Sequence, residues 1–219
     1  MDANPHDEQF YQMARWSIIG RLTASLLHDI NNPLQAIRGS LSLALEELND
    51  AEALRLYIDL GMRESDRVIQ LIALARRLYS NDDQTSVYLD INTLLHGAVV
   101  LTAKELANKQ IKLELQLAEK LPGIWAVFDE LSLAFLCPLL TLSDLMVRHG
   151  GGHLILHSSA ADGVIQVSFI TAVFPHPLPE IPLPICRRVA RAYGGHVRQS
   201  YQDGQTRLRI TLPISNPTE

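Results

Sequence analysis

The sequence predicts an α+β protein in which an N-terminal helical hairpin is followed by an α/β sandwich domain. Apolar residues recur at steps of three and four over the first part of the chain, as in amphipathic helices. A polar linker, SNDDQTS at 80–86, then interrupts this pattern. Beyond it, segments in which apolar and polar residues alternate, as in strands, are interspersed with segments of helical spacing. We therefore predict two domains, covering residues 1–80 and 86–219.

Two long helices are predicted for the first domain. One extends from about Glu8 to Glu47, and the other begins at Ala51, after a short polar break in which Asp50 can cap it, and ends near Tyr79. A connection this short makes the pair antiparallel. Two helices alone cannot cover their own apolar faces, so we expect two copies of the chain to form a dimeric four-helix bundle.

The second domain is predicted to mix strands and helices. The expected strands are 87–89, 111–117, one within 121–128, and two hairpins that turn at Asp162-Gly163 and Asp203-Gly204. The expected helices are 91–108, capped by Asp90, then 129–147 and 183–193. Strand hairpins gathered toward the end of the chain favour a mixed sheet with its helices on one face.

Composition excludes several classes of function. With 219 residues, 47% of them hydrophobic, the chain can build a packed core, and a net charge of -5 argues against nucleic acid as a partner. The first ten residues are polar and acidic, unlike a signal peptide. No segment approaches the roughly 18 uncharged apolar residues of a membrane span. We expect a cytoplasmic protein in which Cys137 and Cys186 are buried thiols.

One stretch of the first helix carries chemistry: ASLLHDINNPLQAI, at 24–37. His28 and Asn32 share a helix face, Asp29 lies beside them, and Pro33 predicts a bend. A single exposed histidine on a helix usually has no catalytic role, but a histidine, a carboxylate, an amide and a proline together are unusual. A neutral imidazole is a nucleophile, a carboxylate can hold one ring nitrogen protonated, and an amide can orient water or a phosphoryl oxygen. An exposed bundle lacks the closed pocket of a hydrolase, so phosphoryl transfer with another protein fits better.

The segment HDINNPL resembles the phosphoacceptor box of bacterial two-component sensor histidine kinases, in which His is followed by Glu or Asp, two variable residues, Asn or Thr, Pro and Leu. The later segments PICRRVARAYGGHVRQS and TRLRITLP are similar to the end of the ATP-binding domain of these kinases. The resemblance implies that His28 is the phosphorylated residue, that Asp29 is its acid–base partner, and that Asn32 positions water when a response regulator is dephosphorylated.

The resemblance fails at the nucleotide site. Pro138 and Leu142 stand where the kinases have the two asparagines of an N-x-x-x-N box, whose second asparagine holds Mg²⁺. The segment TAVFPHP lacks the Asp-x-Gly-x-Gly box, and EIPLPI, with Pro182 and Pro184, replaces the last glycine box, so phosphate-cradling amides are missing. ATP needs a metal ligand, amide donors and an adenine partner. We therefore expect no cofactor, with Mg²⁺ supplied by a partner receiver domain.

No metal site is expected from the histidines at 149, 153 and 157, because the glycines between them break any helix. The chain is thus predicted to be a histidine phosphotransferase of a phosphorelay, a degenerate sensor kinase that forms a homodimer. Its partners would be response-regulator receiver domains, which dock near Leu27, Arg38 and part of the C-terminal domain, and a partner histidine kinase. Two alternatives stay open: an autophosphorylating sensor histidine kinase with an atypical ATP site, and a non-catalytic pseudokinase that binds and regulates a kinase or regulator.

Overall fold

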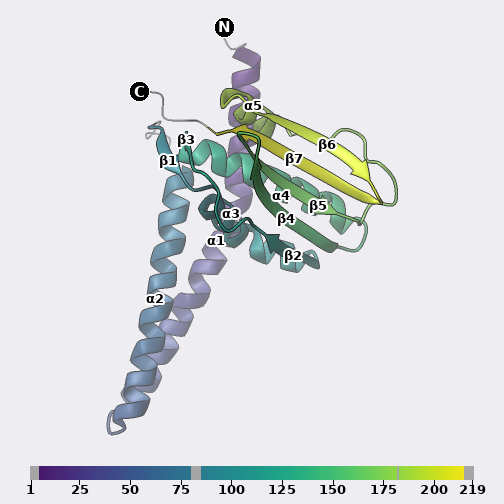
Figure 1. Cartoon of the computed structure of the whole chain (residues 1–219). Helices are drawn as coiled ribbons and strands as arrows, with labels where there is room; N and C mark the ends of the chain where they lie inside the picture. The colour runs from purple at the N-terminus through teal and green to yellow at the C-terminus, as the bar shows by residue number, and fades with distance from the viewer. Residues whose placement is uncertain (1–4, 80–84, 182, 215–219) are drawn as a thin grey trace.

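The computed structural model describes residues 5–79, 85–181 and 183–214. Helices α1 (Pro5–Glu46) and α2 (Ala51–Tyr79) form an antiparallel hairpin (Figure 1). The Asp50 Oδ1 atom accepts hydrogen bonds from the backbone N–H groups of Glu52 and Ala53, at 3.0 and 3.1 Å, which confirms the predicted cap. Helix α1 continues through Pro33, so this proline does not end it.

The second domain has a five-stranded mixed sheet with the strand order β2-β4-β5-β7-β6. Only β2 and β4 are parallel. The strands are β2 (Ile111–Gln116), β4 (Gly152–Ala161), β5 (Val164–Thr171), β6 (His196–Gln202) and β7 (Gln205–Pro213). Both predicted hairpins are present, and their Asp-Gly turns have positive φ at both residues, as tight hairpin turns require. A separate small sheet pairs β1 (Val87–Leu89) with β3 (Ile124–Ala126).

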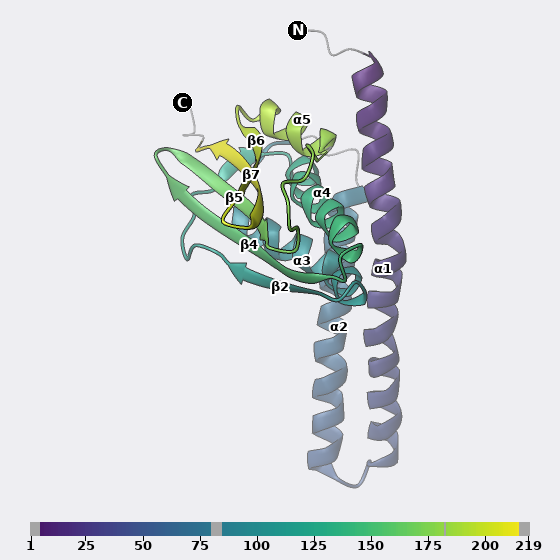
Figure 2. The ribbon, with the colours of Figure 1, turned by 90° about the vertical axis from the view of Figure 1, so that its right-hand side faces the viewer.

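The helices of this domain are α3 (Ile91–Asn108), α4 (Phe128–Val147) and α5 (Pro184–Ala192). They cover one face of the large sheet, as predicted, and α3 and α4 lie between that sheet and the hairpin (Figure 2). The predicted cap of α3 is also confirmed, since Asp90 Oδ1 accepts a hydrogen bond from the Thr93 N–H at 3.0 Å.

Helix α4 lies at the centre of this arrangement. All ten of its residues from 131 to 140 are buried. Its 20 residues are long and apolar enough to cross a membrane by length and composition, so the expectation that no segment comes near a spanning helix was wrong. The apolar character has another cause here, because 72% of the apolar window is buried inside the protein. Cys137 on α4 and Cys186 on α5 are free and buried, as predicted, and burial raises the pKa of both thiols.

The N-terminal half of α1 packs against the second domain. Tyr11, Ile19, Leu22 and Leu26 belong to the same apolar core as the sheet and its helices. The Arg188 guanidinium lies over the Tyr11 ring, 4.0 Å from its centroid. Part of the apolar stripe of the first helix is therefore covered within one chain, which we had attributed to dimerisation alone.

A cluster of charges joins α1 to α3 and α4. Arg21 donates hydrogen bonds to Asp144, at 2.6 and 2.7 Å, and to Glu105, at 2.9 Å from its Nε atom. Lys109 also donates hydrogen bonds to both carboxylates, to Glu105 at 2.7 Å and to Asp144 at 2.6 Å. Burial raises the pKa of each carboxyl, but the hydrogen bonds from Arg21 and Lys109 outweigh burial and hold both pKa values below their ordinary values of 4.5 for Glu105 and 3.8 for Asp144.

This cluster predicts that acid weakens the contact between the hairpin and the second domain. A carboxyl with a lowered pKa in the folded state contributes stability above its ordinary pKa, and that stability is lost as the pH falls through the folded value. The protection factors of amides at the α1–α4 contact, which correct the exchange rate for its intrinsic pH dependence, should therefore fall between about pH 5 and pH 3. Arg21→Met should cost about 1–2 kcal/mol at neutral pH and flatten this dependence. An equally steep acid dependence in Arg21→Met would show that other groups cause it.

Candidate functional site

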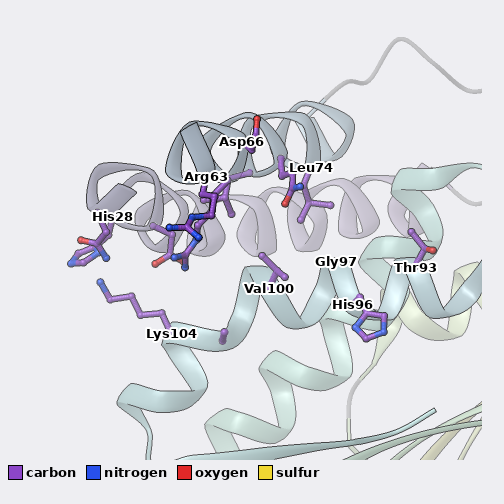
Figure 3. A pocket seen from close by; sticks show the side chains of 15 residues that line it. His28, Arg63, Asp66, Leu74, Thr93, His96, Gly97, Val100 and Lys104 are labelled. Atoms are coloured by element: carbon purple, nitrogen blue, oxygen red, sulfur yellow. The ribbon is translucent and has the colours of Figure 1, made fainter. Parts of the chain in front are cut away.

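His28, Asp29 and Asn32 line one groove between the hairpin and α3, with a volume of about 1190 Å³. All three side chains come from α1, while Arg63 of α2 and residues of α3 form the other walls (Figure 3). His28 and Asn32 share a face, as predicted, and Asp29 lines the groove beside them. The groove itself was not predicted, because an open bundle surface had been expected around His28.

The His28 and Asn32 side chains are exposed, and Asp29 is half-buried. Within the part of the chain that the structure describes, these three side chains form no hydrogen bond or ion pair with one another. An exposed imidazole can be reached by a group on another macromolecule, and it needs no rearrangement of a core to become accessible. A carboxylate and an amide at the same wall can guide a proton or an oxygen once a second group arrives.

The second domain contributes side chains that sequence reasoning missed. Thr93, His96, Gly97, Val100 and Lys104 of α3 all line the groove. Thr93, Gly97, Val100 and Lys104 follow one another at helical steps, so the spacing could have placed them on one face. Nothing in the sequence showed that this face meets α1 near His28, since that contact joins residues more than 60 positions apart.

Apolar side chains stand at the positions where the kinase resemblance predicts nucleotide-binding residues. Pro138 and Leu142 of α4 are buried. The loop between β5 and α5 turns further side chains into the core, with exposed fractions of 1–3%: Phe174, Ile181 and Leu183. Pro182, predicted to block a phosphate-binding amide, lies outside the described residues.

Strand β6 holds this loop in place. The Gln199 Oε1 atom accepts a hydrogen bond from the Ile181 N–H at 2.9 Å, and Gln199 Nε2 donates to the Leu178 carbonyl at 3.0 Å.

A cavity of about 220 Å³ lies where α1 crosses α4 and α5. Pockets that hold drug-sized ligands or cofactors usually have about 300–1,000 Å³. The side chains of Pro138 and Leu142 cannot supply the metal ligand that a bound nucleotide needs.

The three histidines with metal-like spacing do not gather. The His149 ring packs edge-on against Phe174, with ring centroids 5.3 Å apart, and His153 Nε2 lies 3.0 Å from Glu114 Oε2. Among the described residues, no group of three or more His, Cys, Asp or Glu side chains could hold a metal ion.

Comparison with known proteins agrees with this architecture. Residues 18–84 match the His Kinase A (phospho-acceptor) domain family. The chain is 22% identical over 213 residues to the sensor histidine kinase ZraS of Escherichia coli strain K12, which covers 90% of this chain and 46% of that protein. It is 24% identical over 244 residues to the sensory histidine kinase/phosphatase NtrB of Rhizobium meliloti strain 1021, covering 97% of this chain and 63% of that protein. The chain thus spans about half to two thirds of the length of these relatives.

Two solved structures share the fold. The histidine kinase ThkA, in complex with the response regulator TrrA, superimposes with a TM-score of 0.52 at 18% identity, over 98% of this chain and 68% of that one. The full-length kinase ShkA, in complex with AMPPNP, gives 0.51 at 21% identity, over 91% of this chain and 47% of that one. Both domains of the chain therefore have the fold of known histidine kinases.

Proposed function

This chain is built as a two-component sensor histidine kinase transmitter, as the sequence predicted, and from that premise we propose that His28 is a phosphohistidine carrier that exchanges phosphoryl groups with receiver domains. The observation that carries the proposal is the exposed His28 ring at an open groove, with Asp29 and Asn32 at the same wall. A group on a second protein can approach this ring from solvent.

The transfer needs one bond to form and one to break. An imidazole nitrogen attacks the phosphorus of a receiver's aspartyl phosphate, the O–P bond breaks, and its electron pair returns to the aspartate. Asp29 receives the proton of the other ring nitrogen or holds it by a hydrogen bond, as a carboxylate does beside a nucleophilic histidine. The carboxylate of a second receiver then attacks the phosphorus, the P–N bond breaks, and the proton held by Asp29 returns to the ring, so that a neutral imidazole leaves. Asn32 would orient water when the phosphoryl group is hydrolysed, and Mg²⁺ would belong to the receivers.

We infer that the phosphoryl group comes from a receiver rather than from ATP. The buried Pro138 and Leu142 and the apolar core residues of the loop between β5 and α5 support this inference. The similarity to proteins named sensor histidine kinases favours a second candidate, an autophosphorylating kinase with an atypical ATP site.

One experiment separates these candidates. The purified chain is incubated with γ-labelled ATP and Mg²⁺, and in parallel with potassium phosphoramidate, a small donor that phosphorylates imidazoles. Labelling of His28 by phosphoramidate but not by ATP supports the carrier. Strong labelling of His28 by ATP establishes the kinase instead. If neither donor labels His28, the phosphoacceptor role itself is wrong.

We further propose that the hairpin forms a homodimer through its end remote from the second domain. Apolar side chains are exposed along both helices and in their turn there, at fractions of 46–70%: Leu34, Leu41, Leu45, Leu48, Leu56, Ile58 and Met62. Contiguous exposed apolar surface of this kind marks an interface. A second copy supplies the same stripe in return, as two-fold symmetry requires.

Charge placed in this stripe should separate the dimer. Leu41→Glu buries a carboxylate in the interface and should weaken association at least about tenfold. Gln35→Glu adds the same charge at an exposed position on another side of α1 and serves as the control. Sedimentation velocity should show a dimer for the wild type and for Gln35→Glu, and a monomer for Leu41→Glu. A wild-type chain that sediments as a monomer would contradict the proposal.

A further inference from the structure

The lining of the groove beside His28 includes more cations than carboxylates, although the whole chain has a net charge of -5. Its lining includes the cations Arg63, Arg67 and Lys104 against the carboxylates Asp29 and Asp66. Both arginines belong to α2, whereas Lys104 comes from α3 of the second domain. Arg67 has Glu64 as an ion-pair partner at 3.9 Å, so Arg63 and Lys104 are the lining cations that can attract an anion into the groove.

Lys104 is the cation of this groove that extends toward His28. Figure 3 shows its side chain rising from α3 in the direction of the imidazole ring, and both residues line the same groove. The side chain is half-buried, and no ion pair or hydrogen bond of its ammonium group is present among the described residues. The neighbouring Glu105 does not serve as its partner, because Arg21 and Lys109 bind that carboxylate.

The Lys104 ammonium can bind a visiting anion, because it has no ion pair among the described residues. A neutral imidazole offers no such charge. A phosphoryl group carries roughly −1.5 to −2 charge near neutral pH, so phosphorylation of His28 brings an anion to this ammonium.

We propose that Lys104 binds the phosphoryl group while it forms on, and resides at, His28. This inference rests on the proposed function, and it gives the second domain a part in the transfer that requires no nucleotide. Asp29 lies at the same wall and repels a phosphoryl group, so a facing ammonium offsets that repulsion. Lysine suits the task because its charge sits on a flexible four-carbon stem that can follow the group as it moves.

The test measures the initial rate at which potassium phosphoramidate labels His28. In this reaction the P–N bond of the donor breaks, a P–N bond to the imidazole forms, and ammonia leaves. Lys104→Met keeps the length of the side chain and removes its charge, and should slow labelling about fivefold, as expected for one partly solvated charge a few ångströms away. Lys104→Arg should restore most of the rate. Lys120→Met removes an exposed lysine outside the groove and should leave the rate unchanged.

Salt provides a second readout that a purely structural role would not move. Raising the ionic strength should slow the wild type toward the rate of Lys104→Met and should affect that variant less. If wild type and Lys104→Met label His28 equally fast, Lys104 has no such role, although the carrier function stands. If Lys104→Arg is as slow as Lys104→Met, charge is not the cause and the inference is wrong. If His28 of the wild type takes no label, both the inference and the proposed function fail.

Discussion

His28→Gln is expected to abolish labelling of the chain by phosphoramidate and by phosphorylated receivers. Glutamine keeps a polar side chain of similar size at this exposed position, but its amide is not a nucleophile toward phosphorus. The label on the wild type should be acid-labile and alkali-stable, as a phosphorus–nitrogen bond is. Intact-mass spectrometry after a fixed incubation gives the fraction of chains that carry one phosphoryl group.

His96→Gln is the matched control for this experiment. His96 lines the same groove from α3 and is also exposed, so it is equally available to a small donor. The control should label as the wild type does, because Asp29 and Asn32 are positioned beside His28 on α1. Undiminished labelling of His28→Gln would place the phosphoryl group on another residue. An equal loss of labelling in both variants would show that the loss is not specific to His28.

Arg15→Met is expected to cost about 3–5 kcal/mol of folding free energy. Arg15 on α1 and Asp129 on α4 form an ion pair with an N–O distance of 2.7 Å, and the two residues are only 5% and 7% exposed. Removing the guanidinium leaves a carboxylate buried without its main counter-ion. Urea unfolding at a fixed protein concentration measures the loss, and Arg55→Met, at an exposed site on α2, should change stability by less than about 0.5 kcal/mol.

The loss of folding stability in Arg15→Met should depend on pH. Burial raises the pKa of Asp129 above its ordinary value even though Arg15 lowers it, and loss of Arg15 raises it further. A carboxyl with a raised pKa in the folded state contributes stability at low pH that is lost as the pH rises through the folded value. The deficit of Arg15→Met should therefore shrink in acid. Arg15→Met combined with Asp129→Leu should recover much of the stability, since apolar residues can replace a buried pair. A double variant as unstable as Arg15→Met would show that the unpaired carboxylate is not the cause.

The local structure of this chain was predictable from its sequence because local rules decide it. Asp50 and Asp90 cap their helices where a side-chain oxygen precedes an amphipathic run, and both Asp-Gly pairs form the turns that their backbone freedom favours. The helical step of four was enough to place His28 and Asn32 on one face. The resemblance of HDINNPL to a phosphoacceptor box needed only seven consecutive residues.

Contacts between distant segments were beyond such rules. Periodicity marks an apolar face but does not say which partner covers it. The sequence therefore suggested a second copy as the cover for all of the apolar face of α1, whereas the second domain covers its N-terminal half. The apolar run of α4 is equally suited to a membrane and to a core, and burial by the hairpin and the sheet decides between them.

The sequence by itself therefore determined the elements, their turns and caps, and the chemical block around His28, because these depend on residues a few positions apart. Only the tertiary structure decided that α3 faces this block, that Lys104 points toward the imidazole, and that Arg15 meets Asp129 across 114 positions of sequence. The physical reason is that packing and charge pairing act through space, and the fold of the whole chain sets which side chains become neighbours.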